Sequence, residues 1–183
     1  MRSLQGHLLV ASPRLPDVNF YRTVVLIIHH DAQGAFGIVL NRPTESTVDE
    51  IWDDLPATPH QGRAAVNSGG PVEGPLMAIH TNESYGENEI MPGVHFAAHK
   101  DHLNQLVQDP QAEYRVYTGY SGWAAGQLEG ELEFGGWMVM PARRDMIFSD
   151  PEAMWQNAAQ EIGEDVTGEL LTSATVPRDP ACN

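Results

Sequence analysis

Positive charge is scarce in this sequence of 183 residues, in which 10 lysine and arginine residues face 25 aspartate and glutamate residues. The formal net charge is −15, and Lys100 is the single lysine. Proteins that bind nucleic acids take much of their affinity from cations that replace counterions on phosphates. The composition therefore disfavours direct nucleic-acid binding, although backbone N–H groups at a helix N-terminus can still create a local anion site.

Cysteine and long apolar runs are also lacking. The single cysteine, Cys182, can form no internal disulfide. No apolar run approaches the roughly 20 residues that span a bilayer, and the apolar run near Leu8 is too short for a secretory signal. We expect one domain over residues 1–183, with a peripheral tail from about residue 173, no membrane span and a cytoplasmic location.

Sequence motifs for common cofactors and metals are absent. The chain contains no G-x-G-x-x-G pattern after a strand, no P-loop and no H-E-x-x-H pattern, so we expect neither a cofactor nor a zinc-protease site. His29, His30 and Asp31 are potential metal ligands, but neighbours on a strand point to opposite faces. No metal site is assigned from the sequence.

One serine lies in a context that resembles a hydrolase nucleophile elbow. Ser121 is flanked by Gly119 and Gly122, but Trp123 stands where the last glycine of G-x-S-x-G belongs. In that enzyme class the histidine follows the serine, whereas all eight histidines here precede Ser121. We therefore assign no catalytic residue and interpret GYSGW as a packing turn.

Apolar and β-branched runs predict more strands than helices. We expect a short helix over Thr47–Leu55 from a capping-box pattern, helices over Asp101–Val107 and Trp123–Glu133, and a final helix from Asp150 to Gly163. This distribution indicates an α+β fold with a mixed, curled sheet. The predicted strands are 8–11, 24–29, 36–40, 65–67, 75–80, 94–98, 114–118 and 137–140.

Three short motifs form the candidate binding site. The first is NRP at Asn41 to Pro43, where proline is expected to end a strand. The others are SGGPV, with Gly69 and Gly70, and GYSGW, with Gly122 and Trp123. Gln127 is included as a residue expected to hydrogen-bond a neighbouring loop. We expect the motifs to meet at one rim of the sheet. Arg42 would then be the cation for a small anionic ligand, aided by N–H groups of Gly70 or of the start of the Trp123 helix.

These motifs, with GHLLVASPRLPDVNFYRTVVLIIHHDAQGAFGIVLNRP and GGWMVMPA, resemble the YqgE/AlgH family of bacterial proteins from Gly6 to about Gly168. The resemblance implies an α+β fold with a bifurcated sheet, curled into a pseudo-barrel with helices packed against it. It supplies no catalytic residue, and its regulator label comes from a link to alginate control in one branch.

A non-enzymatic binding or regulatory protein, acting through a protein partner or a small anionic ligand, is the function that the sequence favours. An enzyme with an unrecognised site and a transcriptional regulator, as the family label suggests, are the alternatives.

Overall fold

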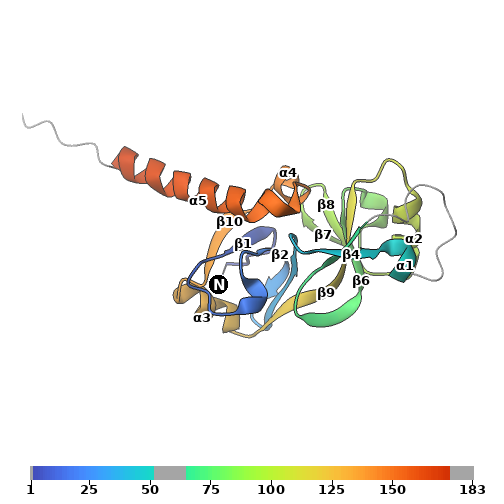
Figure 1. Ribbon diagram of the computed structural model, residues 1–183, viewed down its shortest axis with the longest axis horizontal. Coiled ribbons are helices and arrows are strands. Elements are labelled where there is room, and N and C mark those ends of the chain that lie inside the picture. The colour runs from blue at the N-terminus through green and yellow to red at the C-terminus, as the bar shows by residue number, and fades with distance from the viewer. Residues whose placement is uncertain (1, 52–64, 174–183) are drawn as a thin grey trace, which may run out of the picture.

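The computed structural model describes residues 2–51 and 65–173. In this part of the chain ten strands form one sheet, with the main path β10-β1-β2-β3-β9-β6-β8-β7 (Figure 1). The strands are β1 (His7–Ala11), β2 (Val24–Asp31), β3 (Gly34–Val39), β4 (Pro43–Thr47), β5 (Ala65–Ser68), β6 (Val72–His80), β7 (Asn88–Met91), β8 (Val94–Ala97), β9 (Tyr114–Ala124) and β10 (Trp137–Pro141).

The sheet divides at the long strand β9. The C-terminal part of β9 pairs with β3, through Gly34↔Ala124 to Gly37↔Ser121. Its N-terminal part pairs in parallel with β5, through Val66↔Val116 to Ser68↔Thr118, and β5 in turn pairs with β4. The other edge of β9 pairs antiparallel with β6. The sheet is therefore mixed and bifurcated, as expected from the resemblance.

The sheet curls into a pseudo-barrel without closing. The path ends at β10 and β7, and no pairing between these two strands occurs in the described residues. The amide of Gln5 instead donates to the carbonyls of Glu89 and Ile90 on β7, at 3.2 and 3.5 Å. The Gln5 side chain, just before β1, thus connects β7 at one end of the sheet to the segment that leads into β1 near the other end.

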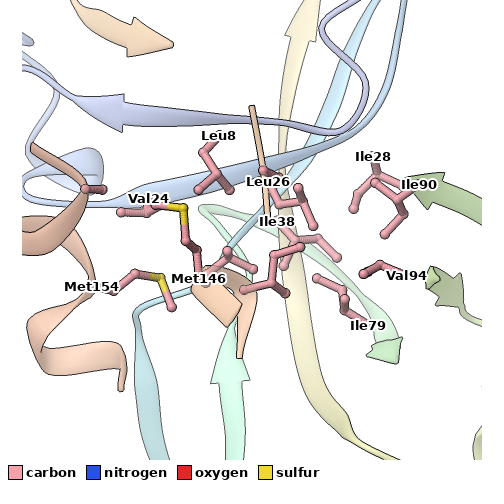
Figure 2. Close-up of a cluster of buried hydrophobic side chains, with 14 of the residues drawn as sticks. Leu8, Val24, Leu26, Ile28, Ile38, Ile79, Ile90, Val94, Met146 and Met154 are labelled. Carbon is pink, nitrogen blue, oxygen red and sulfur yellow. The ribbon is translucent and has the colours of Figure 1, made fainter. Parts of the chain in front are cut away.

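Helices cover the sheet on several sides. They are α1 (Val48–Ile51), α2 (Lys100–Gln108), α3 (Gln127–Glu133), α4 (Arg144–Ile147) and α5 (Pro151–Ser173), with 3-10 turns η1 (Val18–Phe20) and η2 (Glu83–Tyr85). Figure 2 shows Met146 of α4 and Met154 of α5 in the main core beside Val24, Leu26 and Ile38. The first part of α5 packs on the core, and the ribbon of the helix then extends away from the sheet (Figure 1).

The eight predicted strands are all present, but two further strands were missed. Pro43 was expected to stop strand pairing, yet β4 begins at Pro43, which pairs with Asn67. Proline is tolerated here because it is the first residue of a strand that pairs on one side. The polar segment before Val94, in which no strand was predicted, contains β7.

GYSGW is not a turn, because β9 runs through it to Ala124. The expected helix from Trp123 begins only at Gln127, after Gly126 adopts a left-handed conformation with φ of 75°. Gly163 does not end the last helix, which continues to Ser173. The short helix begins at Val48 rather than Thr47, and the part of it that was expected beyond residue 51 lies outside the described residues.

Candidate functional site

Asn41 joins two strand ends through its side chain. Its Oδ1 accepts a hydrogen bond from the Val24 amide at 2.9 Å, and its Nδ2 donates to the Arg22 carbonyl at 2.9 Å. Both groups lie where β2 begins. Asn41 is buried, and both ends of its amide are used within the protein. Its role is to hold the segment that carries Arg22 against the segment that carries Arg42.

The three motifs of the sequence come together as a strand junction. The amide of Ser68 donates to the Arg42 carbonyl and the amide of Gly69 donates to the Thr118 carbonyl, both at 2.8 Å. Ser121 is fully buried, and its Oγ donates to the Gly69 carbonyl at 3.4 Å. This burial leaves no access for a substrate to the Ser121 hydroxyl, in agreement with the packing role expected for it.

Residues of NRP and residues of SGGPV nevertheless line two different cavities. A shallow cavity of about 420 Å³ is lined by Gly70 and by the opposite residues Thr118 and Gly119. Asn41 and Arg42 line another, of about 620 Å³. Gly69, Gly70, Gly122, Trp123 and Gln127 are not among the residues that line the arginine cavity. Convergence of the motifs therefore does not bring the Arg42 side chain to the glycine turn.

Trp123 and Gln127 serve a buried aromatic cluster. The indole N–H groups of Trp123 and Trp137 both donate to Oε2 of Glu131, at 2.9 and 2.7 Å, and the amide of Gln127 donates to Oε1 at 3.0 Å. Phe20 packs against both indoles. One carboxylate of α3 thus fixes two tryptophans from different strands. Gly122 pairs with Phe36 and places its backbone against the Tyr120 ring.

The histidines do not form a metal site in the described residues, since no group of three or more His, Cys, Asp or Glu has suitable geometry there. His29 is exposed and pairs with Asp31. His30 is buried; its Nδ1 accepts from the Leu4 amide at 3.0 Å, so its Nε2 carries the proton that Glu129 accepts at 2.9 Å. This contact connects the N-terminal segment, β2 and α3.

The arginine cavity lies between the start of β2, the start of β4 and the N-terminus of α5. Its lining residues are Arg22, Asn41, Arg42, Pro43, Pro151, Glu152, Trp155 and Gln156. The guanidinium of Arg22 stacks 5.3 Å from the centre of the Trp155 ring and 5.2 Å from the Tyr21 ring. The Trp155 indole N–H donates to the Ala11 carbonyl at 2.9 Å, which fixes the ring on which Arg22 rests.

Both arginines keep unused hydrogen-bond donors. Arg42 donates to the carbonyls of Tyr21 and Asn41, and Arg22 has no side-chain hydrogen bond or ion pair among the described residues. A guanidinium has five N–H donors, so most of those in this cavity have no protein acceptor in the described part of the chain. Partial burial lowers the pKa of the Arg42 guanidinium, which still carries its charge at neutral pH.

Sequence reasoning identified Arg42 and Asn41 but missed Arg22 and Trp155. The scarcity of cations makes any arginine a candidate, and this was the available signal for Arg22. Arg22 has a φ of 52°, which is unusual for a residue with a long side chain and favours a functional or structural constraint. Its contact with Trp155 joins segments far apart in the chain, so no local pattern indicates it.

The fold and this cavity define a class: an α+β protein with an open, bifurcated sheet and an arginine-lined hollow beside its longest helix. The chain belongs to the AlgH-like family, whose model matches residues 8–167. Relatives named UPF0301 proteins include one from Chlorobium phaeobacteroides, 38% identical over 97% of this chain and 95% of its own. One from Thermobifida fusca is 36% identical over 99% of this chain and 96% of its own.

Solved structures agree with this assignment. The solution structure of the AlgH protein from Pseudomonas aeruginosa has a TM-score of 0.75 and 28% identity, and covers 97% of this chain and 96% of its own. The crystal structure of a protein from Corynebacterium diphtheriae, with a TM-score of 0.70, 22% identity and 86% of each chain covered, shares the fold. Within residues 2–51 and 65–173, no helix has the length and apolar character needed to cross a membrane.

Proposed function

We propose that this protein is a non-enzymatic binding protein, which takes a small anionic ligand in the cavity lined by Arg22 and Arg42. The observation that carries the proposal is the convergence of two guanidinium groups on one cavity, with no carboxylate ion pair to either within the described residues. In a chain with a net charge of −15, two cations without such partners on one hollow are unusual. Arginine donors match the oxygens of carboxylates and phosphates in pairs.

The N-terminus of helix α5 also favours an anionic ligand. Pro151 and Glu152, in the first turn of α5, line the hollow, so the positive end of the helix dipole lies beside it. Glu152 acts in the opposite direction, because its carboxylate repels an anion. The charges of the lining sum to one net positive charge, which favours a small anion over a multiply charged polymer.

Binding rather than catalysis is proposed because of the chemistry of the lining. The donors that it offers a ligand are guanidinium and amide groups, from Arg22, Arg42 and Gln156, and its single acid is Glu152. No histidine, cysteine or serine belongs to the lining as described. These side chains can orient an anion, but none of them forms a pair of nucleophile and base.

The test is a thermal-shift and calorimetric titration of the full chain with inorganic phosphate and a panel of phosphorylated and carboxylated metabolites. We expect Arg42→Ala to weaken binding of an active compound at least about tenfold, because a charged hydrogen bond of this kind contributes about 1.5–3 kcal/mol. Arg2→Ala is the matched control, since Arg2 is exposed and lies outside the cavity lining.

A second variant leaves the arginines unchanged. Glu152→Gln removes the opposing charge, and we expect tighter binding, by about two- to fivefold at low salt and less at high salt. A panel with no compound whose binding depends on Arg42 overturns the proposal. The same conclusion follows if Arg42→Ala and Arg2→Ala have equal effects.

A further inference from the structure

A second, smaller cavity adjoins the arginine cavity. It has a volume of about 120 Å³ and is lined by Ala11, Ser12, Pro13, Leu15, Tyr21, Arg22 and Trp155. Arg22 and Trp155 belong to both linings, so their stack forms the wall between the two hollows. The smaller cavity contributes mainly apolar surface and two hydroxyls, from Ser12 and Tyr21, and Arg22 is its single charged residue among the described lining.

The wall between the cavities includes the Arg22 side chain, whose guanidinium is held by ring contacts alone within the described residues. Arg22 contacts the rings of Tyr21 and Trp155, and its guanidinium has no hydrogen-bonding partner in residues 2–51 and 65–173. Trp155, by contrast, is fixed by its hydrogen bond to the Ala11 carbonyl. A ligand whose anionic group attracts the Arg22 guanidinium toward the large cavity would draw it off the ring that it covers. The passage from one hollow to the other would then open beside Trp155.

We infer that the two cavities form one site for an amphiphilic anion, with the anionic group between Arg22 and Arg42 and a short apolar arm in the small cavity. This inference rests on the proposed function and adds the class of ligand. The small cavity has room for about four groups of the size of a water molecule, so the arm is an alkyl chain of about three or four carbons. A bare anion such as inorganic phosphate would use only half of the site.

The experiment measures the affinity of the full chain for inorganic phosphate and for methyl, ethyl, propyl and butyl phosphate by calorimetry. Burial of each methylene should tighten binding about three- to fourfold, until the small cavity is full near the butyl group. In parallel, nuclear magnetic resonance follows the Trp155 indole N–H. Its resonance should move with propyl and butyl phosphate more than with phosphate, because Ala11, its acceptor, lines the small cavity.

Leu15→Phe fills the small cavity without altering either arginine. We expect this variant to bind phosphate as the wild type does and to lose the gain from the longer chains. Val18→Phe is the matched control, since Val18 is 84% exposed and lines neither cavity. If Leu15→Phe does not fold, the chain-length series and the Trp155 resonance of the wild-type protein decide the question alone.

The outcomes separate this inference from the proposed function. Binding of phosphate that depends on Arg42, without any gain from longer chains, overturns the inference and leaves the anion site standing. An equal chain-length gain in the wild type and in Leu15→Phe overturns it as well. If neither phosphate nor any alkyl phosphate binds, the inference fails, and the carboxylates of the panel then decide the proposed function.

Discussion

The backbone around Gly70 leaves no room for a side chain. Its φ is +153°, and a Cβ placed there would lie 2.5 Å from the Oγ of Ser121 and closer still to the carbonyl of Tyr120. Gly69 has a similar approach to the carbonyl of Gly119. The glycines of SGGPV are needed because β9 passes directly against them. The contact between SGGPV and β9 therefore requires residues without a side chain at positions 69 and 70.

Gly70→Ala should lower the free energy of unfolding by at least about 2 kcal/mol, because both the steric overlap and the unusual φ have to be relieved. Ser121→Ala, which alters a neighbouring residue, should cost less than about 1 kcal/mol. The reason is that the Gly69 carbonyl also accepts from the Val39 amide at 2.8 Å and keeps that partner when the 3.4 Å contact is lost. Urea denaturation measures both values, and a larger cost for Ser121→Ala than for Gly70→Ala would contradict this account.

At the scale of elements, strands β6 and β8 place two histidines side by side. His80 pairs with His95 in the antiparallel register, and the rings stack with their centres 5.8 Å apart. His80 is fully buried, and neither of its ring nitrogens has a hydrogen-bond partner among the described residues. Burial, followed by the nearby charge of His95, lowers the pKa of His80 to about 4. The backbone of Asn82 and the Glu87 carboxylate oppose this change, and His102 adds to it.

The pH dependence of stability follows from this burial. The unfolded chain binds a proton at His80 with a pKa near 6.5, whereas the folded state binds it only near pH 4. The unfolded state therefore holds more protons between these values, and the free energy of unfolding should fall as the pH falls from about 6.5 to about 4, by up to about 3 kcal/mol. Above pH 6.5 this contribution is constant.

Chemical denaturation at pH 7, 6 and 5 tests this dependence. His80→Phe should flatten the dependence, because the aromatic ring is kept and the titrating group is removed. His29→Phe is the matched control, since His29 is exposed and distant from β6 in the register of the sheet. Equal slopes for His80→Phe and the wild type would refute the assignment to His80.

At the scale of the whole molecule, the net charge of −15 sets which large partners the protein can approach. Three of the arginines are engaged in separate contacts within the protein. Arg143 pairs with Glu161 and Asp145, Arg144 pairs with Glu113, and Arg115 donates to the Ser149 carbonyl. Arg22 and Arg42 lie in a cavity rather than on a broad face. This distribution favours a local anion site over a surface for a polyanion.

We therefore expect no measurable binding of duplex DNA at physiological salt. A fluorescence anisotropy titration with a labelled duplex is the measurement, repeated at low salt, where the cationic contacts of a true DNA-binding protein are strengthened. Affinity in the sub-micromolar range that weakens with added salt would refute the expectation. A protein with the basic surface typical of DNA-binding domains serves as the positive control.

The predictability of the fold varied with the local pattern. Strands β1, β2, β3 and β10 have nearly continuous apolar runs, so their position was predicted to within two residues. Strand β4 is largely exposed and has the sequence PTEST, which carries no such pattern. It is a strand because the backbone of β5 supplies hydrogen-bond partners, and that information is not local.

The sequence alone determined the acidity and the richness in strands, because charge and side-chain period are properties of single residues or of short windows. The tertiary structure decided that GYSGW is part of a strand and that Arg42 lines a cavity with Arg22 and Trp155, separate from the cavity beside Gly70. Both features depend on how the curled sheet and α5 pack together, through contacts between residues far apart in the chain. Local propensities do not predict these long-range contacts, because tertiary packing determines which of them form.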